Sequence, residues 1–127
     1  MRGKVGTAVT AGVALLLGMF VTADAASVRV RCEKRADRSK ISVDGNDLAA
    51  GSYTATATSG ASSVTAAAKN AVGDEVEFDF DSKANDVAAG ATSIPASFIQ
   101  GNAVTGSIIN ASGQTVASST VGCRVKH

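Results

Sequence analysis

Apolar and polar side chains alternate along most of this chain with a period of two residues, not the 3.6 of an α-helix. Residues 75–81 show it most clearly, because every odd position is acidic and every even position is apolar. Residues 27–33 repeat the pattern, with two valines and Cys32 on one face and charged side chains on the other. Such alternation predicts half-buried β-strands, with one face in a core and the other in water. We therefore expect the acidic face of residues 75–81 to meet solvent: Glu75, Glu77, Asp79 and Asp81.

The remaining segments extend this pattern into an all-β fold. Further strands are predicted over residues 40–43, 52–58, 63–69, 104–109 and 115–125, with turn-forming residues between most of them. Residues 82–97, which contain the only proline, are predicted to be the longest irregular stretch. About seven or eight short antiparallel strands with regular turns are typical of a small β-sandwich. The expected architecture is that of immunoglobulin-like and transthyretin-like modules, in general outline only.

Two cysteines lie in the first and last predicted strands. The chain contains only Cys32 and Cys123, so one intramolecular disulfide is possible. Without tryptophan and with few aromatic residues, the core must consist of small and β-branched side chains. Closing a loop of about 91 residues stabilises a fold by roughly 4.5 kcal/mol in the chain-entropy model. We therefore expect a single disulfide that compensates for a thin core.

The first 25 residues have the features of a cleavable signal peptide. Arg2 and Lys4 precede an apolar run over residues 11–21, which is too short to span a membrane. Ala23 and Ala25 then form a small-residue cleavage site. The sequence thus predicts a signal peptide over 1–25, of a bacterial type, and one mature domain over 26–127. That domain is expected to be secreted or periplasmic, with no membrane span once the signal is removed.

The balanced charge of the predicted mature domain argues against nucleic acid as a partner. Without residues 1–25, ten basic and ten acidic side chains remain, whereas nucleic-acid binding depends on many lysine and arginine contacts to phosphates. The basic residues still gather on the first and last strands, and the acidic ones on strand 75–81. Two arrangements stay open. The two groups either neighbour each other and set strand register, or lie on opposite sheets and form a dipole that could stack with other copies.

Few residues offer catalytic chemistry. The only histidine is His127, the last residue, and both cysteines are expected to be oxidised. A terminal histidine is expected to fray, whereas acyl-transfer catalysis requires an imidazole held beside a nucleophile. We expect a protein that is not an enzyme.

An acidic segment supports one metal hypothesis. Carboxylate and amide oxygens are ligands that calcium prefers, and four such side chains lie at the end of one strand and in its loop. The candidate ligands are Asp79, Asp81, Asn85 and Asp86. Their spacing matches no EF-hand, and the alternative is a solvated strand face that discourages edge-to-edge aggregation.

These observations favour a binding or structural role. The principal hypothesis is a non-enzymatic exported β-sandwich that binds a protein or polysaccharide partner or assembles with copies of itself. A flat face rich in hydroxyl groups is one candidate contact surface: Thr54, Thr56, Thr58, Ser62, Ser63 and Thr65. The second hypothesis is a small calcium-binding module that uses the 79–86 segment. No other cofactor is expected.

Overall fold

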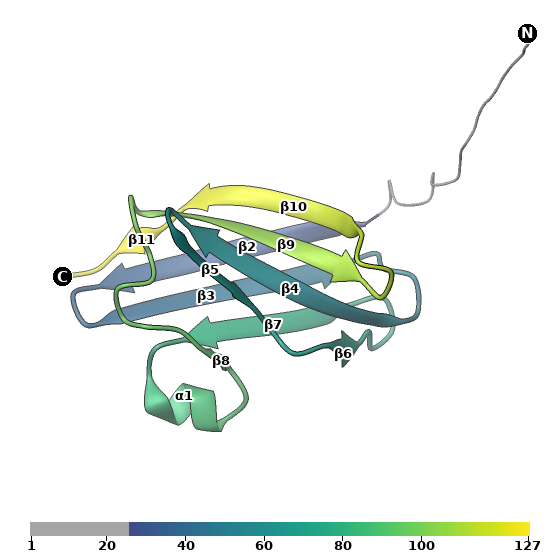
Figure 1. Cartoon of the computed structure of the whole chain (residues 1–127), viewed down its shortest axis with the longest axis horizontal. Helices are drawn as coiled ribbons and strands as arrows, with labels where there is room; N and C mark the ends of the chain where they lie inside the picture. The colour runs from purple at the N-terminus through teal and green to yellow at the C-terminus, as the bar shows by residue number, and fades with distance from the viewer. Residues whose placement is uncertain (1–25) are drawn as a thin grey trace, which may run out of the picture.

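The computed structural model describes residues 26–127, so the predicted signal peptide lies outside the described residues. The chain forms two five-stranded sheets that pack face to face (Figure 1). The first, called here the charged sheet, has the order β11-β2-β3-β7-β8. The second, called the hydroxyl sheet, has the order β10-β9-β4-β5, with β6 also paired to β4. The predicted all-β sandwich is therefore confirmed.

The two longest strands of the charged sheet come from the first half of the chain. Its members are β2 (Ser27–Arg35), β3 (Arg38–Asn46), β7 (Val76–Asp81), β8 (Thr92–Ser93) and β11 (Arg124–Val125). The long strands β2, β3 and β7 pair antiparallel, whereas the two-residue strands β8 and β11 pair parallel to β7 and β2. The short helix α1 (Ala84–Ala88) connects β7 to β8, within the stretch predicted to be irregular (Figure 1).

The hydroxyl sheet is antiparallel throughout. Its members are β4 (Ser52–Ser59), β5 (Ser62–Thr65), β6 (Lys69–Asn70), β9 (Ala103–Asn110) and β10 (Thr115–Gly122). The strand predicted over 63–69 is interrupted, because residues 66–68 leave the ladder between β5 and β6. Seven of the ten strands in the described chain have four or more residues, which agrees with the predicted number.

Alternation explains which side chains form the core. Ile41, Val43, Phe78 and Phe80 point inward from the charged sheet and are almost fully buried. They pack in one core with Tyr53 and with small or branched residues of the hydroxyl sheet: Ala55, Ala57, Val104 and Ile108.

Gly106 on β9 marks a close approach of the two sheets. A Cβ atom there would lie 2.7 Å from Val30 Cγ2 and 2.9 Å from Val43 Cγ2. Such contacts are too short for packed carbon atoms, so only glycine fits at this position without displacing β2 or β3.

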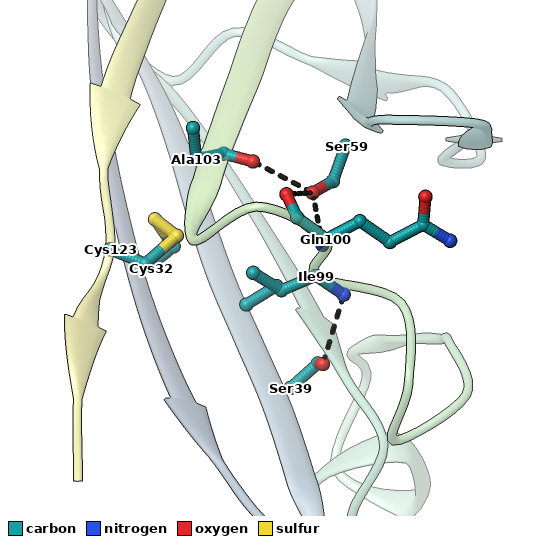
Figure 2. The surroundings of a disulfide bond; sticks show 7 residues. All are labelled: Cys32, Ser39, Ser59, Ile99, Gln100, Ala103 and Cys123. Carbon is teal, nitrogen blue, oxygen red and sulfur yellow. Dashed lines mark hydrogen bonds between the residues drawn. A yellow bond between two sulfur atoms is a disulfide. The ribbon is translucent and has the colours of Figure 1, made fainter.

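The last strand connects the two sheets. Residues 115–125 are predicted as one strand, but β10 ends at Gly122 and the chain then joins the charged sheet as β11. Cys123 lies at the crossing, and its backbone N–H donates to the carbonyl oxygen of Asn102 at 2.7 Å. The Cys32–Cys123 disulfide forms there, which confirms the predicted pairing (Figure 2).

Two buried serines fasten the segment that precedes β9 to the rest of the molecule. The Ser39 hydroxyl donates to the carbonyl oxygen of Ala96 at 2.7 Å and accepts from the Ile99 N–H at 3.3 Å. The Ser59 hydroxyl donates to the Ala103 carbonyl oxygen and accepts from the Gln100 N–H, both at 2.7 Å (Figure 2). Because β3 carries Ser39 and β4 carries Ser59, this segment is bonded to both sheets beside the disulfide.

Candidate functional site

A groove lies where the chain passes from β10 to β11, beside the disulfide. Its volume is about 510 Å³, within the range of sites that hold small molecules. Four strands contribute to it: β2, β3, β10 and β11. The lining residues are Val30, Arg31, Cys32, Glu33, Lys40, Ser42, Val121, Gly122 and Arg124.

Positive charge predominates in this groove. Arg31, Lys40 and Arg124 are cationic, and Glu33 is the one carboxylate of the lining. That carboxylate accepts a hydrogen bond from Arg35 Nε at 2.8 Å and lies 3.7 Å from Lys126 Nζ.

Arg35 and Lys126, which lie outside the groove, compensate the negative charge of Glu33. The Arg35 hydrogen bond, aided by the charge of Lys126, holds the Glu33 pKa below its ordinary value despite some desolvation. Since neither Arg35 nor Lys126 lines the groove, the charges of the groove's own cations remain in excess.

Among the described residues, one of the three groove cations has a salt bridge. Arg31 Nη2 lies 3.2 Å from Asp44 Oδ2. Burial raises the pKa of Asp44, and the nearby Glu77 carboxylate raises it further. Within residues 26–127, Lys40 and Arg124 form no ion pair with a side chain. Both are therefore available to an anion.

Two of the four predicted calcium ligands, Asp81 and Asp86, are arranged around an arginine. Arg38 Nε donates to Asp81 Oδ1 at 3.0 Å, and Arg38 Nη2 donates to Asp81 Oδ2 and Asp86 Oδ2, each at 2.7 Å. The Lys83 backbone N–H also donates to Asp81 Oδ1 at 3.0 Å. The guanidinium thus compensates two of the three carboxylates in the calcium hypothesis.

Asp81 departs from its predicted position. Alternation placed it in solvent, but the residue is 2% exposed, so that expectation was wrong. The reason is that the pattern of one strand does not include Arg38 or α1, which cover the end of β7. Burial raises the pKa of Asp81, but the hydrogen bonds from Arg38 and the Lys83 N–H outweigh this and hold it below its ordinary value. The Asp81 hydrogen bond likewise raises the pKa of Arg38 against its burial.

The other two predicted ligands lie apart from this pair. Asp79 is on the outer face of β7 and accepts from the Ser42 hydroxyl at 3.1 Å, while Asn85 is exposed on α1. In the described part of the chain, no three histidine, cysteine, aspartate or glutamate side chains group as a metal site would require. Calcium binding remains a prediction, and it would require Arg38 to give up its contacts.

The basic and acidic strands are neither direct neighbours nor on opposite sheets, the two arrangements that the sequence left open. The basic strand β2 and the acidic strand β7 belong to the same sheet, but β3 separates them. Register aligns Arg29, Asp44 and Glu77 in one row across the sheet, and Arg31, Ser42 and Asp79 in another. The outer face is therefore basic along one long strand and acidic along another.

The hydroxyl-rich face is wider than the sequence indicated. Two rows cross four strands: Ser63, Thr58, Thr105 and Thr120, then Thr65, Thr56, Ser107 and Ser118. Hydroxyls bond across strands, with Thr105 and Thr120 at 2.6 Å and Ser107 and Ser118 at 2.9 Å. The alternation of residues 104–109 and 115–121 was the signal that could have added β9 and β10 to this face.

Catalytic residues are scarce in the described chain. Neither cysteine is free, and His127 is exposed at the C-terminus. Among residues 26–127, no helix is long and apolar enough to cross a membrane. No protein-family model, curated protein or solved structure matches this chain.

Proposed function

We propose that this protein is a non-enzymatic, exported binding module whose groove accepts a small organic anion. The observation that carries the proposal is the excess of cationic side chains in the groove, with Glu33 compensated from outside it. Export is supported by the signal-like features of residues 1–25 and by the disulfide, which suits an oxidising compartment.

The composition of the groove indicates the class of ligand. Lys40 and Arg124 can donate charge-assisted hydrogen bonds to a carboxylate, sulfate or phosphate group. Val30, Val121 and the disulfide offer apolar surface beside them. An anion that carries a compact apolar group uses both features, as ligands of small pockets commonly do.

A pair of isosteric probes tests this proposal. Amide chemical shifts are followed by NMR while benzoate, and separately benzamide, is titrated into the disulfide-bonded protein. We expect saturable shifts in β2 and β11 with benzoate and none with benzamide, because only the former carries charge. Lys40→Gln together with Arg124→Gln should weaken benzoate binding at least about tenfold, since two charge-assisted hydrogen bonds are lost.

Arg29→Gln is the matched control. It removes a cation from the same sheet, outside the groove, and should not weaken benzoate binding. Equal binding of benzamide, or equal weakening by Arg29→Gln, would show that the groove does not recognise an anion. Tight binding of poly-glutamate alone, without benzoate, would point instead to an acidic peptide and overturn the small-ligand proposal.

A further inference from the structure

The outer face of the charged sheet separates opposite charges that lie in register. Arg29 and Glu77 occupy one row, with Asp44 between them, and Arg31 and Asp79 occupy the next row, with Ser42 between them. Two strand spacings of about 4.8 Å place β2 and β7 roughly 10 Å apart. Within residues 26–127, Arg29 and Glu77 form no ion pair, and both are exposed.

Consider a twofold axis that lies between two facing copies and runs parallel to β3. A half-turn about it exchanges the positions of β2 and β7 and keeps each row at the same height along the strands. A second copy laid face to face in this way sets its Glu77 over Arg29 and its Asp79 over Arg31, and the reverse pairs follow by symmetry. A half-turn about an axis across the strands would oppose β2 to β2, with arginine facing arginine. The charge pattern therefore selects one orientation. We propose that the outer face of the charged sheet binds a second copy of this chain in that orientation, as an isologous dimer.

Residues of β3 lie on the axis and meet their own counterparts. Ser42 at the centre is neutral. Asp44 is 3.2 Å from Arg31 of its own chain, and Lys40, which forms no ion pair within residues 26–127, is the register partner of Glu33. The attraction comes from the rows of Arg29 and Arg31. In the next row Glu33 faces the second copy's Asp81, whose charge Arg38 compensates. Packed sheets lie about 10 Å apart and within about 30° of each other, which long arginine and glutamate side chains can span.

This inference goes beyond the groove and does not depend on it. The two sites share Arg31, Lys40 and Ser42, so an occupied groove and a formed dimer should oppose each other through linkage. Dimerisation through exposed ion pairs is weak and depends strongly on salt. The expected species is a reversible dimer that screening dissociates.

Sedimentation velocity on the disulfide-bonded protein tests the dimer. The wild type should dimerise at about 20 mM salt and dissociate at about 500 mM, where the Debye length falls from roughly 20 Å to roughly 4 Å. Arg29→Glu alone, or Glu77→Arg alone, should raise the dissociation constant at least about tenfold, because each turns two symmetric attractions into repulsions. Both substitutions in one chain exchange the charges and should restore the dimer.

Asp37→Arg is the matched control for Glu77→Arg, because it makes the same charge change at an exposed turn residue outside the face. It should leave the dimer intact. A monomeric wild type at low salt, or a double variant that fails to regain the dimer, would overturn the proposal. Arg29→Glu should keep benzoate binding while losing the dimer, so failure of the groove and failure of the dimer are distinguishable.

Discussion

Each edge of the charged sheet ends in a two-residue parallel strand, but the two edges are stabilised by different interactions. At one edge, the two-residue strand β11 runs parallel to β2 and is fixed by the Cys32–Cys123 disulfide. At the other edge, β8 runs parallel to β7, next to the ion network of Arg38 with Asp81 and Asp86. Two paired residues contribute little to holding a strand, so we expect each edge to depend on a further interaction. We call this interaction the clamp of that edge: the disulfide beside β11 and the ion network beside β8.

The clamps differ in what they respond to. A disulfide constrains the unfolded chain and is indifferent to protons, but a reductant removes it. Breaking the ion network costs most stability when both partners are desolvated and hydrogen-bonded, and protonation of its carboxylates removes the interaction. Arg38 and Asp81 satisfy that condition, since their side chains are only 17% and 3% exposed. One edge is thus sensitive to redox conditions and the other to acid.

Removing the disulfide should have the largest effect on stability. Cys32→Ala with Cys123→Ala frees a loop with a sequence separation of 91 residues. The free energy of unfolding should fall by about 4.5 kcal/mol, because the unfolded chain gains the entropy that the bond removed. Urea denaturation with and without reductant measures this change. If reductant leaves the wild type as stable as before, the comparison of clamps fails at this edge.

Breaking the ion network should rank second. Asp81→Asn keeps the shape of the side chain but leaves Arg38 half-buried with only Asp86 as its anionic partner. Breaking one partner of a buried pair costs about 3 kcal/mol, since the remaining charge stays desolvated. Denaturation at neutral pH gives the value, and Arg38→Met combined with Asp81→Leu should recover part of the loss. A loss below about 1 kcal/mol would place Asp81 among ordinary surface carboxylates.

Sequence patterns predicted the disulfide edge better than the ionic edge, for a physical reason. Alternation is a local property, so it identified the strands and the inward valines of β2, and two cysteines left one pairing. Arg38 and Asp81 are 43 residues apart, and nothing in either strand indicates that they meet. The groove was equally hidden, because the pattern of residues 115–125 continues through the point where the chain changes sheets. Tertiary packing, not local preference, decides both features.

Acid should distinguish the two clamps. The pKa of Asp81 is lower in the folded protein than its ordinary value of 3.8, so its contribution is complete above that value. As pH falls below about 4, the unfolded chain binds a proton more readily than the folded one, and this contribution is lost. The stability difference between wild type and Asp81→Asn should therefore shrink toward acid pH. The pKa of Asp44 is raised, so Asp44→Asn should change the acid profile in the opposite direction.

The smallest loss of stability is expected when a carboxylate at the disulfide edge is replaced by its amide. Glu33→Gln removes a carboxylate that accepts from Arg35 and lies near Lys126, as Asp81→Asn does beside Arg38. Here both cations are 43% exposed, so water can solvate them when the carboxylate is gone. Exposed pairs contribute about 0 to 1 kcal/mol, and the loss should lie in that range. Denaturation of Glu33→Gln and Asp81→Asn side by side compares the two. Equal losses would mean that desolvation is not what separates the edges, and that the Arg38 network has no more strength than a surface pair.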